Sequence, residues 1–131
     1  ASNKVTVPYA SSLPDLITQS TYVTAGSMTP GGSVSVSGSV RNIGKGNAGA
    51  FKIGYYIHNS LYLPSALKPI ATLSRTGLNA GLSASLSQTL KVPTTVGAGT
   101  WYVHIKVDYE NKVAEASEGN NDWNQQVLVL P

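Results

Sequence analysis

Apolar and polar residues alternate one by one in several stretches of this chain. In residues 33–42, SVSVSGSVRN, the valines fall on one face and the serines on the other, and residues 101–108, WYVHIKVD, alternate in the same way. A period of two is that of a half-buried β-strand, whereas an amphipathic helix repeats every 3.6 residues. The same alternation, in places weaker, marks residues 15–23, 51–58, 69–73, 82–92 and 123–130. We therefore expect about seven strands and no sustained helix.

Glycine- and proline-rich turns separate these stretches. They include TPGG (29–32), NIGKGNAG (42–49) and VPTTVGAG (92–99), whose residue types interrupt regular structure. Short, half-polar strands that follow one another at such spacing are typical of two antiparallel sheets packed face to face. A chain of 131 residues fits one domain, so we expect a single all-β sandwich over residues 13–131. Residues 1–12 are interpreted as a linker or a fraying N-terminal segment.

Charged side chains are few and unevenly placed. They make up 11% of the chain, against about 25% in an average soluble domain, and five of the six carboxylates lie within residues 108–122. The basic residues are scattered without a Lys/Arg run, so nucleic-acid binding is not expected. The absence of cysteine excludes disulfides and cysteine-ligated zinc in this chain. The longest aliphatic run, VLVL, is far shorter than the ~20 residues of a membrane-spanning helix, so membrane insertion is not expected.

Four stretches, in order along the chain, resemble one family. They are PDLITQS (14–20), VRNIGKGNAGAF (40–51), GAGTWYVHIKVD (97–108) and DYENKVAEASEGNN (108–121). The last is the most specific, because the family pattern there is an Asp, then Asn-X-Val-X-Glu, then Glu-X-Asn-Asn. The matching positions are Asp108, Asn111, Val113, Glu115, Glu118, Asn120 and Asn121. On these residues the chain resembles the CARDB family, the cell-adhesion-related domain of bacteria and archaea, over residues 13–130.

The resemblance implies an immunoglobulin-like antiparallel β-sandwich of about seven strands in two sheets. It also implies a non-catalytic extracellular accessory module of a larger secreted or surface protein, serving adhesion, spacing or substrate contact. Such a module would lie outside the cell or on the surface of a bacterium or archaeon. Its partners would be neighbouring domains of the same chain and a polysaccharide or cell-surface protein. One departure stands out: residues 58–69, HNSLYLPSALKP, replace an acidic loop that many members carry.

The acidic stretch 108–122 allows three interpretations. Two carboxylates that flank a cleft can hydrolyse glycosides, but these lie on one short connection, and the chain has neither a G-X-S-X-G nor an H-E-X-X-H motif. No catalytic residue is therefore assigned, and the chain is not expected to be an enzyme. Calcium is the second interpretation, because Ca²⁺ takes 6–8 oxygen ligands and clustered Asp, Glu and Asn supply them. The stretch does not have the spacing of an EF-hand, so a calcium site here would have to be a nonstandard one, and no cofactor other than calcium is considered.

The third interpretation is that these side chains hold their own loop. Carboxylates and Asn side chains form short bonds to backbone groups, and leaving one such group buried and unpaired costs about 1–3 kcal/mol. Asp108, at the end of a strand, would accept from the amides of the turn, and Val113 would pin the loop to the core. Asn120 or Asn121 would adopt a left-handed conformation cheaply. The residues assigned to loop structuring or to calcium are Asp108, Asn111, Glu115, Glu118, Asn120 and Asn121.

Two predicted strands carry aromatic side chains on their polar faces. In an immunoglobulin-like sandwich residues 51–58 and 101–108 pair antiparallel in one sheet, which places their outward residues side by side. Ordinary cross-strand packing is one interpretation of these residues. A binding face is the other, because tyrosine rings contact ligands with little loss of entropy. The candidate binding face comprises Tyr56, His58, Tyr102 and His104, and a carbohydrate-binding module that uses these exposed aromatics is the alternative function.

Overall fold

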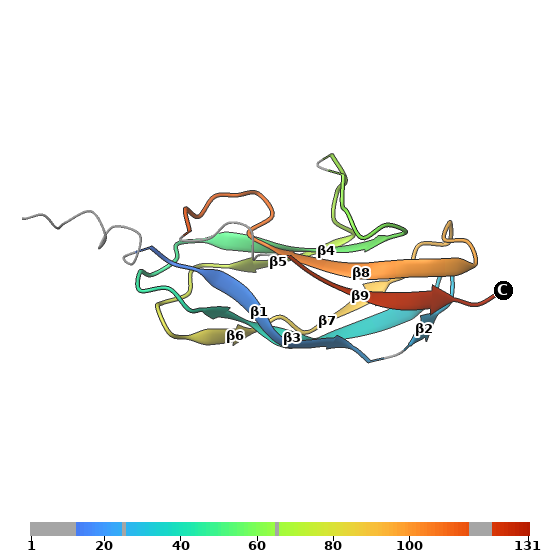
Figure 1. Ribbon diagram of the computed structural model, residues 1–131, viewed down its shortest axis with the longest axis horizontal. Helices are drawn as coiled ribbons and strands as arrows, with labels where there is room; N and C mark the ends of the chain where they lie inside the picture. The colour runs from blue at the N-terminus through green and yellow to red at the C-terminus, as the bar shows by residue number, and fades with distance from the viewer. Residues whose placement is uncertain (1–12, 25, 65, 116–121) are drawn as a thin grey trace, which may run out of the picture.

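Two β-sheets packed face to face make up the domain (Figure 1). The computed structural model describes residues 13–24, 26–64, 66–115 and 122–131, and its regular structure in these ranges consists of strands alone. The strands are β1 (Leu16–Val23), β2 (Ser27–Met28), β3 (Ser33–Asn42), β4 (Phe51–His58), β5 (Ala71–Arg75), β6 (Ser83–Ser85), β7 (Gln88–Lys91), β8 (Gly99–Val107) and β9 (Asp122–Val129). One sheet has the order β1-β3-β6, with β7 also paired to β3, and the other has the order β2-β9-β8-β4-β5. We call the second one the β8 sheet, after its central strand.

The residues that alternate in the sequence form the core between the two sheets. Ten inward side chains of β3, β4 and β8 are buried: Val34, Val36, Val40, Phe51, Ile53, Tyr55, Ile57, Val103, Ile105 and Val107. Burying a side chain of this size contributes about 1.5–3 kcal/mol, so the alternation decides which face of each strand turns inward. The hydroxyl of Tyr55 donates to the carbonyl of Leu86, and burial raises the pKa of Tyr55 to about 12. The predicted all-β sandwich is confirmed.

The strand predicted over residues 82–92 is divided in two. β6 pairs with β3 at residues 39–41 and β7 pairs with β3 at residues 33–36, while the fully buried Leu86 lies between them. The opposite neighbour of β3 is also irregular, because the register of β1 shifts between Gln19 and Tyr22, where Ser20 has a φ of +51°. Gly38 on β3 faces this bulge. A Cβ at position 38 would lie 2.6 Å from the hydroxyl oxygen of Thr21, so β1 comes closer to β3 here than a residue with a side chain would allow.

Two contacts close the side of the sandwich formed by β1 and β9. The two-residue strand β2 pairs in parallel with the end of β9, and two residues are too few to show a period in the sequence. Further along β9, the side-chain amide of Gln125 accepts from the backbone amide of Val23 (3.0 Å) and donates to the carbonyl of Val23 (3.5 Å). The carboxamide thus pairs with the backbone of β1 as a neighbouring strand would, and it joins the two sheets.

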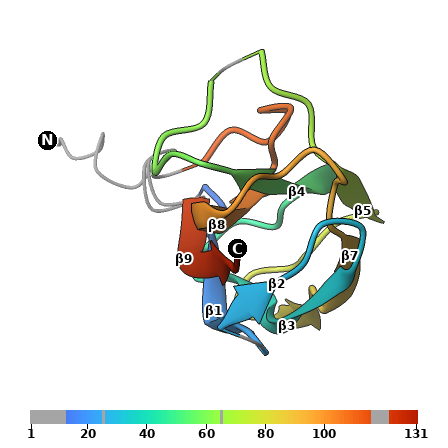
Figure 2. The same cartoon turned by 90° about the vertical axis from the view of Figure 1, so that its right-hand side faces the viewer.

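The layout of the chain separates its two ends and gathers two connections. β1 begins at one end of the long axis and the chain ends, after β9, at the other (Figure 1). The β4–β5 connection and the β8–β9 connection both rise from the outer face of the β8 sheet (Figure 2). In the described ranges no helix has the length and apolarity needed to cross a membrane. The expected linker, residues 1–12, lies outside the described residues.

Candidate functional site

Asp108 organises the turn that follows β8. Its Oδ1 accepts from the amide of Lys112 at 3.0 Å and its Oδ2 from the amide of Val113 at 2.9 Å. Asp108 is 2% exposed, and a carboxylate so buried needs donors of this kind because an unpaired one is strongly destabilising. Asp108 and Asn111 both have a φ of +55°, a left-handed conformation that Asp and Asn adopt more readily than most other residues. The amide of Asn111 donates to the carbonyl of Asp108 at 2.8 Å, which closes the turn.

The last described part of this connection is tied to the core and to the first sheet. Val113 is buried in the core cluster. The buried carboxylate of Glu115 accepts from the amide of Leu16 at 2.7 Å, at the residue where β1 begins. Asp108 and Glu115 thus make the contacts of loop-structuring residues. Glu118, Asn120 and Asn121 lie outside the described residues.

Asn42, fully buried at the end of β3, is a structuring residue that the sequence pattern does not single out. Its Oδ1 accepts from the amides of Asp15 and Gly44, each at 3.0 Å. Its Nδ2 donates to the carbonyls of Gly46 (2.8 Å) and Leu78 (2.9 Å). These four bonds use the full capacity of the carboxamide. The partners come from three separate segments, and the one available signal was that Asn42 falls within a stretch that resembles the family.

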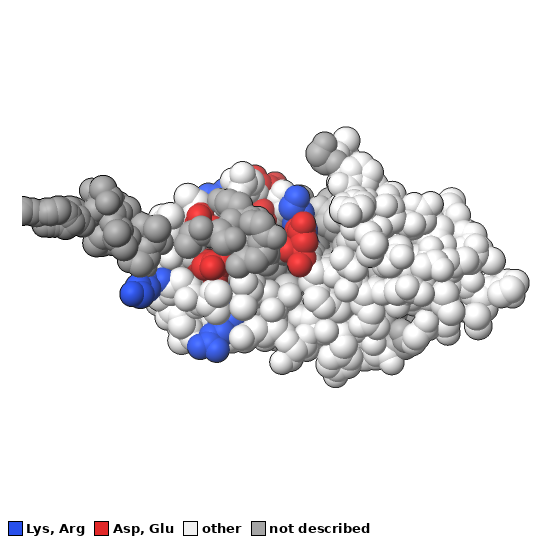
Figure 3. Space-filling view, viewed as in Figure 1, with Lys and Arg blue, Asp and Glu red and all other residues white. Residues whose placement is uncertain are grey.

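Acidic side chains gather around the β8–β9 connection (Figure 3). Among the described residues no three His, Cys, Asp or Glu side chains are arranged so that they could hold a metal ion. Asp108 and Glu115 are buried within the fold and accept from backbone amides, so they do not face each other across an open cleft. The calcium interpretation stays a prediction, because it also involves residues that lie outside the described ranges.

Aromatic residues line up on the outer face of the β8 sheet. The register pairs His58 with Tyr102 and Tyr56 with His104 across β4 and β8, which confirms the predicted pairing of these strands. The next strand, β9, places Asn124 beside His104. The ring centroids of Tyr102 and His104 lie 6.2 Å apart, with the rings tilted by 58°. All four residues therefore occupy the face to which the alternation assigns them.

The β4–β5 connection, residues 59–70, covers part of that face (Figure 2). Tyr56 is 4% exposed and His104 is 3% exposed, so the expectation that both rings are exposed is wrong. The carbonyl of Ser60 lies 2.9 Å from Nε2 of His104 and holds the start of the connection against β8. His58 and Tyr102 stay half-buried. Alternation assigns a side chain to a face, but it does not say which distant segment packs on that face.

The β8–β9 connection adds a second cover, at Gly54 on β4. A Cβ on Gly54 would lie 3.1 Å from the ring of Tyr109, so the missing side chain lets that ring rest on the sheet. Desolvation raises the pKa of the neighbouring Tyr56, and the charges of Tyr109 and Asp122 act in the same direction. Desolvation also lowers the pKa of His104, against the opposing effect of its bond to Ser60.

A pocket lies on each side of the β4–β5 connection where it crosses β8. The first, which we call the Tyr62 pocket, has a volume of about 180 Å³ and lies between the tip of the connection, β8 and β9. Its polar lining includes Lys106, Asp122 and Asn124. The second, the Lys68 pocket, has a volume of about 220 Å³ and lies between the rest of the connection, Tyr56 on β4 and Tyr109. Lys106 lines both pockets.

The tip of the connection exposes large apolar side chains. Tyr62 is 82% exposed and Leu61 is 51% exposed. Neither residue was a predicted site residue, although SLYLP is an apolar run within a segment otherwise marked as a turn. Scattered exposed apolar residues are ordinary, but these two also line the Tyr62 pocket.

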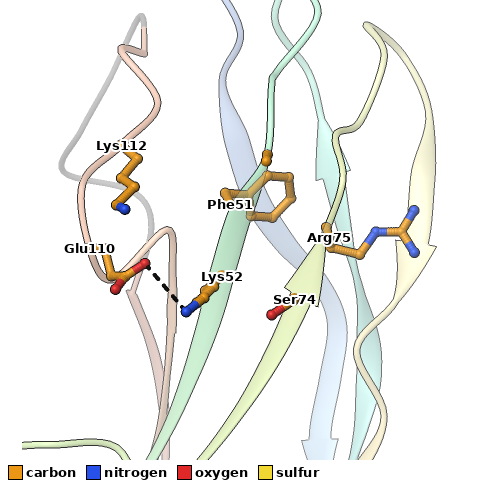
Figure 4. Close-up of a pocket in the computed structure, with 7 residues that line it drawn as sticks. Phe51, Lys52, Ser74, Arg75, Glu110 and Lys112 are labelled. Carbon is orange, nitrogen blue, oxygen red and sulfur yellow. Dashed lines mark ion pairs between the residues drawn. The ribbon is translucent and has the colours of Figure 1, made fainter.

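A third pocket, of about 170 Å³, opens where β4 and β5 meet the β8–β9 connection (Figure 4). Lys52, Arg75 and Lys112 line it together with Glu110, whose Oε1 lies 4.0 Å from Nζ of Lys52. The guanidinium of Arg75 points away from this ion pair (Figure 4). The cationic groups therefore do not converge on one point, and we assign no ligand to this pocket.

The chain matches a known protein family over nearly all of its described residues. A family model, CARDB, matches residues 13–125, which include both connections and both pockets beside Lys106. The chain belongs to the CARDB family. The predicted membership is confirmed. No curated protein matches the chain.

Solved structures resemble this CARDB domain over most of its length. The CARDB domain of a Pyrococcus furiosus protein, crystallised in complex with di-metal ions, is 21% identical with a TM-score of 0.65, and 90% of each chain is covered. A domain of a putative cell surface protein from Methanosarcina acetivorans is 20% identical with a TM-score of 0.63, over 90% of this chain and 93% of that one. Thermotoga neapolitana β-glucosidase 3B, in complex with α-D-glucose, is 19% identical with a TM-score of 0.59, over 90% of this chain but 16% of the enzyme. At these identities the likeness shows the fold alone.

Proposed function

We propose that this CARDB domain is a non-catalytic accessory module of a larger secreted or surface protein of a bacterium or archaeon. Its partners would be neighbouring domains of the same chain and a polysaccharide or surface protein, and the role requires no cofactor. The likeness to a domain of a putative cell surface protein supports a location outside the cell. The burial of Asp108 and Glu115 supports a role without catalysis, because both carboxylates are engaged with backbone amides.

The spacing part of this role is supported by the placement of the chain ends. β1 begins at one end of the long axis and the chain leaves β9 at the other (Figure 1). Domains that precede and follow this one would therefore be held apart by the length of the sandwich. The side chain of Gln125 joins the two sheets, and the bonds of Asn42 join three segments of the chain, which supports a spacer that keeps its folded shape.

The contact part of the role rests on the exposed tip of the β4–β5 connection, which is the observation that carries the proposal. Tyr62 and Leu61 project from the outer face beside a pocket, with 82% and 51% of their surface exposed. An exposed aromatic ring offers a large and rigid contact area at a small entropy cost, and aromatic residues are enriched among those that dominate binding energy. We place the contact at this tip because two of the four residues of the candidate binding face, Tyr56 and His104, are covered, while His58 and Tyr102 stay half-buried.

Carbohydrate is the second candidate ligand, favoured by the Tyr62 pocket. Small-ligand sites combine apolar walls with a few convergent polar groups, and here Asp122, Asn124 and Lys106 face the apolar tip. Carboxylate and carboxamide oxygens accept from hydroxyl groups, while an exposed ring packs on the apolar face of a sugar. A sugar unit would thus engage the tip of the connection and the β9 strand at once.

A retention experiment tests the contact role. The domain, fused to a fluorescent protein, is applied to envelope preparations of the source organism and to insoluble polysaccharides, and the retained fraction is measured. We expect the double variant Leu61→Ser, Tyr62→Ala to reduce retention about tenfold. The matched control is Leu82→Ser, because Leu82 is 55% exposed but lies immediately before β6, at the other sheet. Equal retention of the wild type and the double variant would refute the assignment of the contact surface.

A further inference from the structure

The two pockets beside Lys106 are direct neighbours. Leu63 and Lys106 line both of them, so these two side chains form the wall that the pockets share. Each volume, about 180 Å³ and about 220 Å³, is smaller than the roughly 300–1,000 Å³ of a site for a drug-sized ligand. A ligand made of ring-sized units, with consecutive units in adjacent pockets, fits these volumes better than one large compound does.

Two lysines and no acidic residue are among the described residues that line the Lys68 pocket. These lysines are Lys68 and Lys106, and among the described residues neither lies within 4.0 Å of a carboxylate. Of the acidic residues nearby, Asp122 is paired with Lys106 in the register of β8 and β9 but lines only the Tyr62 pocket. Asp108 and Glu115 accept from backbone amides, and Glu110 lies beside Lys52. In a concave site partly shielded from water, two ammonium groups attract an anionic group more strongly than they would on an open surface.

The Tyr62 pocket requires a different kind of ligand group. Asp122 lines it, and an ionised carboxylate only accepts hydrogen bonds, so Asp122 requires a donor and repels an anion. Asn124 both accepts and donates, and the exposed ring of Tyr62 forms an apolar wall. A sugar ring supplies both hydroxyl donors and an apolar face, whereas the side chains of a poly-glutamate peptide supply no hydroxyl donor and no ring.

We propose that these two pockets together bind an acidic polysaccharide with uronic-acid units. The carboxylate of one unit lies between Lys68 and Lys106, and the ring of the neighbouring unit packs on Tyr62 with its hydroxyls bonded to Asp122 and Asn124. This inference rests on the proposed contact role of the β4–β5 connection and adds the chemical class of the ligand.

Titration with matched oligosaccharides tests the inference. The probes are oligogalacturonate, its methyl ester, oligomannuronate and a poly-glutamate peptide, with the affinity measured by NMR or calorimetry. We expect at least one of the two uronates to bind, and the methyl ester to bind about tenfold more weakly than its acid because the charge is masked. Lys68→Gln and Tyr62→Ala should each lower the uronate affinity about five- to tenfold. Lys91→Gln, at an exposed lysine of β7 on the other sheet, should leave it unchanged.

Several outcomes would overturn the inference. They are equal binding of the acid and its ester, binding of poly-glutamate that does not depend on Tyr62, and no binding of either uronate at millimolar concentration. Thermal melts of each variant show whether a loss of affinity comes from unfolding. If the Leu61→Ser, Tyr62→Ala variant loses surface retention while Lys68→Gln keeps its uronate affinity, the contact role stands and the acidic polysaccharide is refuted.

Discussion

The β8–β9 connection and the β4–β5 connection rise from the same face of the β8 sheet, but they are held in different ways (Figure 2). The first turns two of its carboxylates inward: Asp108 accepts from two loop amides, and Glu115 accepts from the start of β1. Its Val113 reaches the core. The second connection exposes two large apolar side chains, Leu61 and Tyr62.

The β4–β5 connection depends mainly on backbone contacts. Leu67 donates to the carbonyl of Pro64, and Ile70 donates to the carbonyl of Tyr55. Its hydrogen bond to β8 joins the carbonyl of Ser60 and Nε2 of His104. A connection whose charged residues turn inward stabilises the fold, whereas one whose apolar residues turn outward leaves them available to a partner. Unfolding experiments on both connections test this contrast.

The largest expected effect is at Asp108. Asp108→Ala leaves two amides without their acceptor and places alanine at a φ of +55°, so we expect a loss of about 2–3 kcal/mol in the free energy of unfolding. Asp108→Asn keeps one acceptor oxygen and a residue that tolerates this φ, and should lose about half as much. Urea denaturation measures both changes. A gain in stability for either variant would mean that repulsion among the acids outweighs these bonds.

A matched pair of glutamates gives the next largest difference. Glu115→Ala removes the acceptor for the amide of Leu16, and we expect a loss of about 1–2 kcal/mol. Glu110→Ala removes only a partly exposed ion pair at 4.0 Å, and should change stability by no more than about 0.5 kcal/mol. The pair is compared in the same urea titration. Equal losses at the two positions would contradict the distinction between them.

A smaller effect is expected from pH, acting through His104 under the β4–β5 connection. Desolvation lowers its pKa in the folded state, and the neighbouring His58 acts in the same direction, while the bond to Ser60 and the charge of Asp122 oppose it. A lowered folded-state pKa means that the unfolded chain binds the proton more readily. The contribution of His104 is thus fully present above its unfolded pKa of about 6.5 and is lost as the pH falls through the folded value.

The measurement compares unfolding midpoints in urea at neutral and mildly acidic pH. His104→Gln should flatten the decline of stability on the acid side of neutrality relative to the wild type. Asp122→Asn, which removes a charge that favours protonation of His104, should make the decline slightly steeper. An unchanged pH profile in His104→Gln would show that other groups govern it.

The smallest effect is expected at the tip of the β4–β5 connection. Leu61→Ser and Tyr62→Ala remove side chains that are 51% and 82% exposed, so each should change the free energy of unfolding by no more than about 0.5 kcal/mol. Thermal melts of both variants check this. A loss of stability comparable to that of Asp108→Ala would mean that the tip stabilises the fold. It would contradict the contrast between the two connections.

Part of the β8–β9 connection could be predicted from the sequence. Asp108 and Val113 act within a few residues of their own position, so the spacing in the acidic stretch was enough to assign them to the loop. A left-handed backbone conformation was expected at Asn120 or Asn121, which lie outside the described ranges, and this expectation stays a prediction. The structure has left-handed conformations at Asp108 and Asn111, where none was predicted.

Local order along the chain determined the long strands, the inward face of each of them and the family, because side chains in a strand alternate with a fixed period and need no distant partner to do so. It did not predict β2 or the division of residues 82–92 into β6 and β7. Tertiary structure alone decided which outward residues stay exposed. Tyr56 and His104 are covered because two connections from other parts of the chain pack over them. Asn42 and Gln125 have hydrogen-bond partners up to 102 residues away. The alternation of apolar and polar residues does not predict contacts between such distant positions. The contact surface that we propose at Tyr62 likewise depends on tertiary structure, because the β4–β5 connection lies beside β8 and leaves its apolar tip exposed.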